Sequence, residues 1–507
     1  MEWGKLLATR RLAKEEREPR CFDKFEISEF EKDYRRIVST DAFRRLQDKT
    51  QVFPLEKSDF VRTRLTHSVE ASSIAKQLGV MVYKDLKNHR IENGTFQISA
   101  EQALDVSDVL MCAGLLHDVG NPPFGHFGEA VIGQWFADNL DLKFKGVSIA
   151  ERLNAQQKSD LLNFEGNAQA LRTLLRRDCT CNGSGSNLTC AVLATLVKYP
   201  VDSCLFDGDS DDVKLHKPGF FHSEKNVARE VFAETGMLKP DGVVARHPLT
   251  FLLEAADDIA YATGDLEDAF KKHYFSLNEF VEYFRAEREK LLKRDGCDIN
   301  EKSGELLDDL SCLIRDNDGN ASDLEIFQKW IEGVRRWLMY VCAYSFTANI
   351  RKIMDGAYSN DLFDDTFHSV TIKILKGAMT EFVYDDFEIA KLELAAQTIL
   401  YDLLGKFVGA VLYYDDPGYT EKRSDDELEV TTACEKIDNH ANKPCFTAAH
   451  KKLCNVISES CRAEYERAKT DDENNNLYLR LRMVVDYVSG MTDSYAKSLY
   501  QELCGIY

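Results

Sequence analysis

The sequence predicts a mainly α-helical fold, and three observations support that prediction. Apolar residues recur at helical spacing over most of the 507-residue chain, as at Ile74, Ala75 and Leu78, whereas the alternation typical of a half-buried strand is hard to find. Hydrophobic residues make up 44% and charged residues 29% of the chain, enough to form buried cores that offset the entropy of folding. Prolines number only 10, too few for a linker-rich or fibrous protein. We therefore expect one elaborated helical body.

The first informative helix is expected to begin at about residue 66. Thr66 is a plausible cap, and apolar positions then recur through Leu78. This arrangement places His67 in the first turn of the helix.

The second informative helix is expected over residues 106–119. It is apolar nearly all round and ends in the dipeptide His117-Asp118. A buried helix would therefore present a His-Asp pair at its end. Because an unpaired buried carboxylate is costly, such a pair calls for a partner.

The third informative helix is expected over residues 248–270. Glu254, Asp257, Tyr261 and Asp265 follow one another at spacings of three and four, so they form one polar stripe along an otherwise apolar helix. A polar stripe on a core helix requires an explanation.

Four segments interrupt the helical pattern and are interpreted as loops or insertions, because their polar or acidic compositions cannot pack a core. They lie at about 178–190, 202–219, 293–325 and 414–446. None is rich enough in Pro or Ser to act as a flexible tether between domains.

The charge and the cysteines narrow the class of protein. A formal charge of −21 repels polyanions, so a phosphate-bearing partner needs a local basic cluster or a bound cation. The basic runs 172–177 and 480–482 are expected to be solvated helix faces. The 14 cysteines include no Cys-x-x-Cys pair, and we interpret most of them as reduced, buried thiols. Cys179, Cys181 and Cys190 form the one cluster worth weighing for zinc, but a fitting fourth ligand is missing.

The chain is expected to be cytoplasmic and to make no contact with a membrane. Its N-terminus mixes charges into the apolar residues and has no signal-peptide core. No continuous apolar stretch approaches the roughly 18 residues needed to cross a bilayer.

A shared divalent cation explains the three helices most simply. His67, His117, Asp118 and one carboxylate of the pair Asp257-Asp258 would supply two nitrogens and two oxygens. Such a set leaves positions for water and a phosphate oxygen. The plainer interpretation, that each histidine is a hydrogen-bonded core or surface residue, stays open at this point.

The order His67, His117-Asp118, Asp257 resembles the signature of the HD-domain metal-dependent phosphohydrolases. More narrowly, several longer motifs look like those of the deoxyguanosine triphosphate triphosphohydrolases. The motifs are 44–53, 62–68, 114–129, 164–169, 254–261 and 486–493. The resemblance covers residues from about 30 to 275 well and the last 30 residues fairly. It implies an HD-domain helical core with additional helices and inserted loops, over residues 1–275, and a helical C-terminal part over 276–507.

The resemblance implies hydrolysis of dGTP, and of other dNTPs, to the deoxynucleoside and inorganic tripolyphosphate, by metal-activated water attacking the α-phosphate. One divalent ion per site, Mg²⁺ or Mn²⁺, is expected on His67, His117, Asp118 and Asp257, and Asp258 is the fallback. His126 would transfer the proton, with Glu129 orienting its imidazole. A tight structural loop or a second metal are the alternatives for His126.

The remaining site residues are also implied by the resemblance. Phosphate contacts are expected from Arg64, Lys198, Tyr199 and Lys217, with Asn167 as a polar donor nearby. Gln51 and Val52 would line the base and sugar pocket. Tyr261 and Asp265 would contact the deoxyribose. Solvated lysines and a core-packed tyrosine are the plainer alternatives.

The expected partners are the nucleotide, further copies of the chain in a homo-oligomer (a hexamer by the resemblance) and single-stranded DNA. Two other functions remain open. One is a different HD-domain nucleotide phosphohydrolase, and the other is a regulator that binds a nucleotide or single-stranded DNA without hydrolysis.

Overall fold

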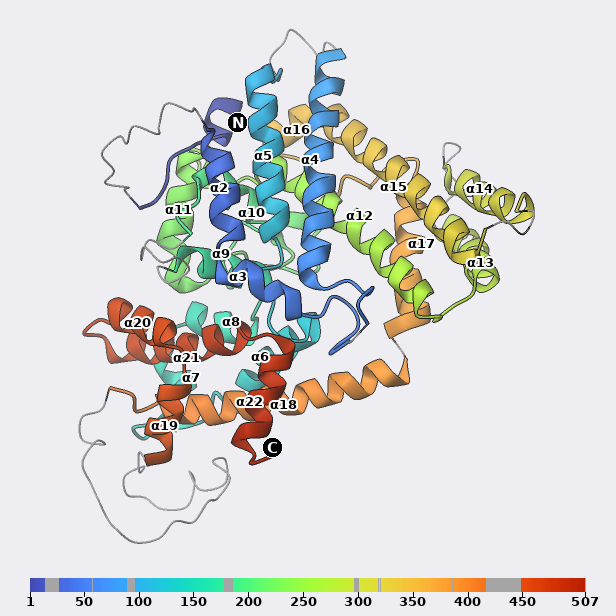
Figure 1. The fold of residues 1–507 in the computed structure, drawn as a ribbon. Coiled ribbons are helices and arrows are strands. Elements are labelled where there is room, and N and C mark those ends of the chain that lie inside the picture. Colours follow the sequence, from blue (N-terminus) through green and yellow to red (C-terminus); the bar gives the residue numbers. More distant parts are fainter. Residues whose placement is uncertain are drawn as a thin grey trace.

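The computed structural model describes residues 1–13, 27–56, 58–88, 96–176, 186–295, 301–317, 319, 321–384, 386–415 and 448–506. The prediction of a mainly helical fold is confirmed, since helices dominate these residues (Figure 1). The one sheet they contain pairs β1 (Lys143–Phe144) with β2 (Val147–Ser148) in antiparallel register.

Three long helices form the centre of the upper part of Figure 1 and pack against one another: α4 (Arg64–Asn88), α5 (Ala100–Leu116) and α12 (Pro248–Lys271). Further helices surround them. They are α1 (Trp3–Leu6), α2 (Glu29–Val38), α3 (Asp41–Arg45), η1 (Leu46–Asp48), α9 (Gly166–Leu175), α10 (Cys190–Leu196), η5 (His222–Glu224), α11 (Lys225–Glu234), α13 (Leu277–Asp295), α15 (Asp323–Ala348), α16 (Ile350–Met354), α17 (Ser369–Met379) and η6 (Thr380–Tyr384).

The predicted start of α4 was wrong by about one turn. The helix begins at Arg64, and Thr66 lies inside its first turn rather than capping it. Thr63 precedes the helix, and its N–H donates to the Thr66 hydroxyl while that hydroxyl donates to the Thr63 carbonyl. This reciprocal pair occupies the place of a capping box. His67 still lies in the first turn, with its side chain buried.

Helix α5 begins six residues earlier than predicted, at Ala100. Ser99 accepts from the Gln102 N–H, and the Gln102 side chain bonds back to the Ser99 N–H. The sequence therefore held a capping box that the apolar pattern alone did not reveal. Helix α12 has the predicted start, with Pro248 in its first turn, where the missing N–H costs nothing.

A second group of helices packs below the first in Figure 1. It includes α6 (Gly125–Asn139), α7 (Ile149–Arg152), α8 (Ala155–Leu162), α18 (Phe387–Val411), α19 (Ala448–Val456), α20 (Glu459–Ala468), α21 (Glu473–Ser489) and α22 (Asp493–Leu503). Their apolar core joins residues of about 124–168 to residues of about 396–499. The C-terminal helices thus pack onto the segment that directly follows His117-Asp118. The division of the chain near residue 275 stays a prediction.

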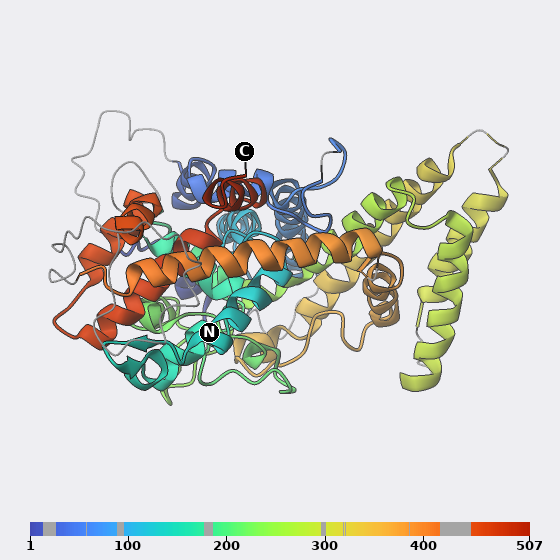
Figure 2. The ribbon, with the colours of Figure 1, turned by 90° about the horizontal axis from the view of Figure 1, so that it is seen from below.

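Helix α18 crosses the molecule as one long element (Figure 2), and α22 packs against it. Among the described residues it alone is long and apolar enough to span a membrane, yet 50% of its most apolar window is buried inside the protein. Packing against α6, α19 and α21 accounts for its apolar face.

The loop predictions agree with the structure in part. Residues 202–219 are irregular apart from the short helix η4 (Val213–Leu215). The prediction for 293–325 was wrong in part, because α14 (Ser303–Arg315) lies within it and packs under Trp330, whose indole N–H donates to the Leu306 carbonyl at 2.7 Å. Residues 177–185 and 416–447 lie outside the described residues, and with them Cys179 and Cys181.

The sequence analysis expected the basic runs to be solvated helix faces, and this expectation was wrong for the described residues. Arg172, Arg480 and Arg482 are buried. Arg172 binds Asp486 of α21 in a bidentate pair, with Nε at 2.8 Å from Oδ1 and Nη2 at 2.7 Å from Oδ2. This pair ties α9 to the C-terminal helices.

We expect Asp486→Ala to lower the free energy of unfolding by about 3–5 kcal/mol, because the change leaves a buried guanidinium unpaired. Burial raises the pKa of Asp486, but Arg172 and Arg176 lower it well below the ordinary value of 3.8. The contribution of the carboxylate is therefore full above about pH 4 and is lost as the pH falls toward the folded-state pKa.

Urea unfolding at pH 7 and at pH 3 measures this effect. The exposed pair of Arg44 and Asp41, with side chains 60% and 68% exposed, supplies the control, and Asp41→Ala should cost about 1 kcal/mol or less. A variant of Asp486 as stable as the parent at pH 7 would contradict the assignment.

Candidate active site

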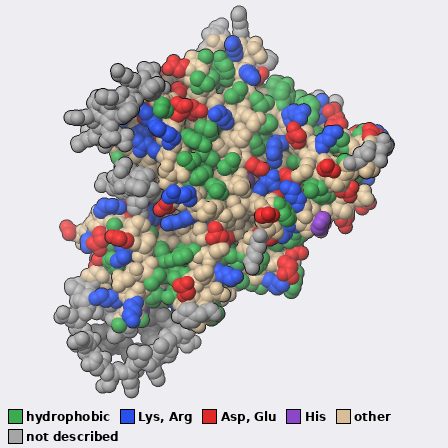
Figure 3. Space-filling view, in the orientation of Figure 1, with side chains coloured by type: hydrophobic (Ala, Val, Ile, Leu, Met, Phe, Trp, Pro, Cys, Tyr) green, Lys and Arg blue, Asp and Glu red, His purple; other side chains and the backbone are tan. Residues whose placement is uncertain are grey.

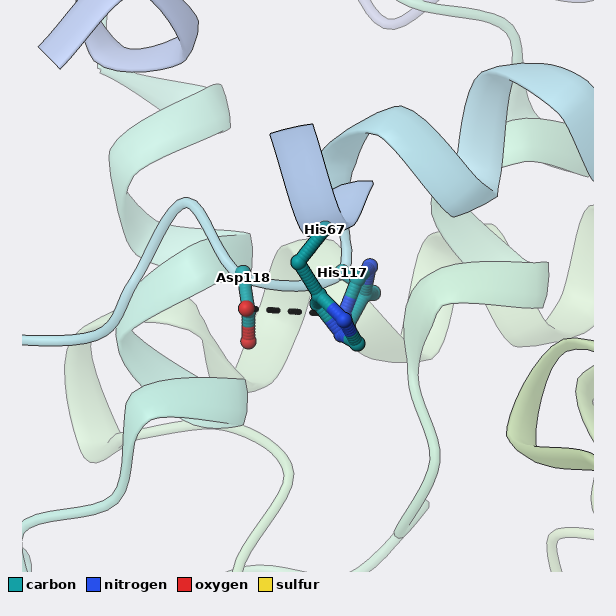
Figure 4. Close-up of side chains that lie close together, drawn as sticks. All are labelled: His67, His117 and Asp118. Carbon is teal, nitrogen blue, oxygen red and sulfur yellow. Dashed lines mark ion pairs between the residues drawn. The ribbon is translucent and has the colours of Figure 1, made fainter. Parts of the chain in front are cut away.

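His67, His117 and Asp118 lie together where α4 begins and α5 ends (Figure 4). One possible ligand atom from each lies within 4.8 Å of the others, and all three residues are buried. The two imidazole rings are 5.2 Å apart at their centroids. Two nitrogens and one carboxylate oxygen thus converge from separate helices, as the sequence predicted.

Asp257 of α12 completes this group. Its Oδ1 lies 3.1 Å from His67 Nε2 and 3.2 Å from His117 Nε2. Asp258, the fallback, instead pairs with Lys376 at 2.8 Å between Oδ1 and Nζ. Because neighbouring residues on a helix point about 100° apart, only one of the two can face the histidines. The structure brings Asp257 there.

The hydrogen bonds of His117 leave one ring nitrogen available to a cation. His117 Nδ1 donates to the Gly114 carbonyl at 2.8 Å, so Nε2 is the atom that can offer a lone pair to a metal ion. That buried Nε2 has no hydrogen-bond partner, and neither has His67 Nδ1. An unpartnered buried polar atom is costly. The four residues therefore fit a divalent cation, for which imidazole nitrogens and carboxylate oxygens are suitable ligands.

Charged neighbours stabilise both carboxylates of this group. Arg64 Nη1 lies 2.8 Å from Asp118 Oδ2, and Asn121 donates to Asp118 Oδ1. Burial raises the pKa of Asp118, but Arg64 and the histidines lower it well below its usual range. Lys198 Nζ lies 2.7 Å from Asp257 Oδ2. Both acids are thus held in the ionised form that a cation requires.

His126 and Glu129 form a second pair on the first turn of α6. His126 Nδ1 lies 2.8 Å from Glu129 Oε2, and the other carboxylate oxygen accepts the Gly166 N–H at 2.8 Å. The Glu129 side chain is only 9% exposed and that of His126 is 74% exposed. A buried carboxylate thus orients an exposed imidazole through its Nδ1 and leaves Nε2 free of that contact, the arrangement of an acid-base pair.

Three of the predicted phosphate contacts lie beside these two groups. Arg64 and Lys198 pair with Asp118 and Asp257, as described above, and Lys217 Nζ lies 3.1 Å from Glu165 Oε2. Asn167 donates to the same Glu165 carboxylate at 2.7 Å. Tyr199 follows Lys198 in the chain, and burial raises the pKa of its hydroxyl.

The predicted sugar and base residues also gather near one another. Asp265 is 1% exposed, and neither of its carboxyl oxygens has a hydrogen-bond partner among the described residues. Burial raises the pKa of Asp265 well above its usual range, and the Gln51 side chain lies beside the carboxyl. The Tyr261 hydroxyl contacts the hydroxyl of Tyr384. Val52 is half-buried beside Gln51 and packs against the core.

The sequence analysis missed three residues of this region. Glu165 holds Lys217 and Asn167, Lys376 pairs with Asp258, and Tyr384 meets Tyr261. Glu165 lies within the recognised motif 164–169, two positions before Asn167, so its charge was a usable signal in the sequence. Lys376 and Tyr384 lie on α17 and η6, where no pattern marked them.

The fold and the site define an HD-domain protein with a place for a divalent metal ion. The HD domain family model matches residues 64–164, and the model of the phosphohydrolase-associated domain matches residues 446–502. The first of these ranges contains His67, His117, Asp118 and the pair of His126 and Glu129.

Similar proteins identify the family. The chain is 38% identical over the full length of both chains to a deoxyguanosinetriphosphate triphosphohydrolase-like protein of Listeria innocua, and 34% identical, again over all of both, to one of Synechocystis. It is 30% identical, over 95% of each chain, to a deoxyguanosinetriphosphate triphosphohydrolase of Yersinia pseudotuberculosis. The chain belongs to this family of HD-domain hydrolases, so the resemblance is confirmed.

Proposed function

We propose that the protein hydrolyses dGTP, and other deoxynucleoside triphosphates less well, to the deoxynucleoside and inorganic tripolyphosphate. One observation carries the proposal: His67, His117, Asp118 and Asp257 converge beside the His126–Glu129 pair, with Arg64, Lys198 and Lys217 around them. The names of the relatives support the choice of nucleotide.

Each group has a role in the proposed reaction. The two histidines, Asp118 and Asp257 would hold Mg²⁺ or Mn²⁺, which would supply Lewis-acid stabilisation of a phosphate oxygen and lower the pKa of water. Arg64, Lys198, Tyr199 and Lys217 would bind the triphosphate, with Asn167 donating a further hydrogen bond. Gln51 and Val52 would line the base and sugar pocket.

His126 would move the protons. A water oxygen bonds to the α-phosphorus, and the bond from that phosphorus to the 5′-oxygen breaks. His126 Nε2 either takes the proton of the attacking water or protonates the departing 5′-oxygen. Glu129 keeps the proton on Nδ1, since its Oε2 lies 2.8 Å away, and stabilises the charged imidazole.

Product analysis tests the proposal. Purified protein is incubated with dGTP, dATP or GTP in the presence of Mg²⁺ or Mn²⁺, and the products are separated by chromatography. Deoxyguanosine and tripolyphosphate are the expected products. Orthophosphate or pyrophosphate would indicate a different HD-domain phosphohydrolase. Binding without any turnover would indicate a regulator.

Asp265→Ala should raise the KM for dGTP about 10–100-fold, because the 3′-hydroxyl would lose a buried acceptor. The KM for 2′,3′-dideoxy-GTP, which lacks that hydroxyl, should stay within about threefold. The free energy of unfolding should not fall, because neither carboxyl oxygen has a hydrogen-bond partner among the described residues. Asp265→Asn keeps an acceptor and is the matched control. An equal loss with both nucleotides would remove Asp265 from the sugar site.

We also propose a homo-oligomer, hexameric by the family resemblance, that acts in the cytoplasm. The exposed aromatic residues on α15 support self-association: Trp337, Tyr340 and Tyr344 are 44%, 57% and 54% exposed. The described cysteines are free thiols, as expected in a reducing compartment.

Single-stranded DNA as a partner rests on the resemblance. On the face drawn in Figure 3, the described basic side chains lie in small groups among acidic ones, so a DNA contact would need a confined groove. Light scattering with and without an oligonucleotide tests both assembly and binding.

A further inference from the structure

The turn that carries His126 has an unusual backbone. Between α5 and α6, Phe124 has φ 63° and Gly125 has φ 60°. Glycine adopts this left-handed conformation readily, but a phenylalanine there is strained. The Phe124 side chain is buried in the lower core. Surrounding contacts must therefore hold the turn, and with it the imidazole two residues later.

Asp493, the first residue of α22, supplies such contacts. Its Oδ1 accepts the Phe124 N–H at 2.9 Å, and its Oδ2 accepts the Thr50 N–H at 2.9 Å as well as the Thr50 hydroxyl. The residue is only 2% exposed. Hydrogen bonds from backbone N–H groups to a buried carboxylate are strong and directional. One side chain thus fixes the strained turn and the residue before Gln51.

Lys49 strengthens the same junction. It is 3% exposed, and its Nζ donates to the Asn121 carbonyl of the loop and to the Ser489 carbonyl, the latter at 2.9 Å. Lys49 therefore holds the middle of the loop, and Asp493 holds the residue that directly precedes α6. The segment that bears Asp493 lies in the phosphohydrolase-associated domain.

The loop has little freedom to move without disturbing the site. A Cβ added to Gly125 would lie 2.6 Å from Arg64 Nη2, so the backbone passes directly against the arginine that holds Asp118. Gly128 packs directly against the Pro123 carbonyl, because a Cβ added to Gly128 would lie 2.1 Å from that oxygen. Because no free space remains at Gly125 and Gly128, a displacement of Phe124 would be passed along the chain to His126.

We propose that Asp493 is a positioning residue for the reaction, which locks the Phe124–Gly125 turn so that His126 faces the substrate. The phosphohydrolase-associated domain thereby contributes to catalysis without contacting the nucleotide. This inference rests on the proposed function for its kinetic consequence, but the contact between Asp493 and the turn has a readout of its own.

Asp160 offers a matched control, because it is also a buried carboxylate that joins an earlier part of the chain to a C-terminal helix. It is 0% exposed and accepts from the Ser203 hydroxyl at 2.6 Å, the His222 N–H at 2.7 Å and the Tyr478 hydroxyl at 2.6 Å. None of these groups belongs to the turn before His126. A purely structural role would make Asp160 and Asp493 behave alike.

The kinetic experiment compares Asp493→Ala, Asp493→Asn and Asp160→Ala with the parent, using dGTP at saturating Mn²⁺. Asp493→Ala should lower kcat about 30–100-fold, since small displacements of a reacting group cost about this much. Asp493→Asn keeps one acceptor and should lose less. The affinity for Mn²⁺ should stay within about threefold. Asp160→Ala should lower the melting temperature but leave kcat within about threefold.

Hydrogen–deuterium exchange supplies the readout that needs no activity. Peptides covering residues 119–127 should exchange at least about tenfold faster in Asp493→Ala, and peptides around His67 should not change. Unaltered exchange of the loop overturns the contact. Faster exchange with an unchanged kcat overturns the positioning role, as does an equal loss of kcat in Asp160→Ala.

A parent protein that fails to hydrolyse dGTP would refute the proposed function, whereas the exchange measurement would still decide whether Asp493 holds the turn. If Asp493→Ala does not fold, Asp493→Asn provides the same two measurements.

Discussion

His117→Ala is expected to weaken Mn²⁺ binding at least about 100-fold and to lower turnover of dGTP by about 1,000-fold or more. The imidazole is buried, its Nδ1 is held by the Gly114 carbonyl, and its Nε2 faces Asp257 Oδ1 at 3.2 Å without a hydrogen-bond partner of its own. No other side chain among the described residues replaces that nitrogen. Isothermal titration with Mn²⁺ measures the loss directly.

Protons should compete with the metal at His117. Burial lowers the pKa of His117, but Asp257 and Asp118 outweigh it and raise the pKa to about 9 in the metal-free protein. Because a cation needs the neutral imidazole, Mn²⁺ affinity should rise with pH up to about 9. His368 is the matched control, since it is 2% exposed and bonds Thr371 outside the site. If His117→Ala bound Mn²⁺ as His368→Ala does, the metal assignment would fail.

His126→Ala is expected to lower kcat by about 100-fold to 10,000-fold, the usual contribution of a general acid or base. The Mn²⁺ affinity and the KM for dGTP should stay within about threefold, because His126 lies on α6 outside the group of metal ligands and its side chain is 74% exposed. Steady-state kinetics at saturating Mn²⁺ separates the two parameters.

Glu129→Gln is the companion variant. It keeps the size of the side chain but removes the charge that orients His126 Nδ1, so it should lose less activity than His126→Ala. Full turnover in His126→Ala would assign the proton transfer to another group. Such a result would also favour the interpretation that His126 is part of a structural loop.

Helix periodicity predicted which of these side chains lie together. The spacing of three and four on α12 favoured Asp257 over Asp258, and the structure places Asp257 against both histidines while Asp258 pairs with Lys376. The apolar character of α5 likewise predicted a buried His117-Asp118 pair. These features follow from local sequence, since the period of one helix decides which residues share a face.

Long-range contacts could not be predicted in the same way. Tyr384 reaches Tyr261 across 123 positions in the chain, and Asp493 reaches Phe124 across 369. The motif containing Asp493 was recognised, but its contact with Phe124 depends on how α22 and α6 both pack against α18. Helix α14 was missed because its acidic composition hid the apolar spacing of Leu306, Leu307 and Leu310, which pack in the core.

Hydrolysis of dGTP in water enriched in ¹⁸O, followed by mass spectrometry of the products, tests the central claim most directly. We predict one ¹⁸O atom in tripolyphosphate, on the phosphorus that was α in the nucleotide, and none in the released deoxyguanosine. Label in orthophosphate, pyrophosphate or the nucleoside hydroxyl would contradict attack at the α-phosphorus, and the assignment of the site would have to be abandoned.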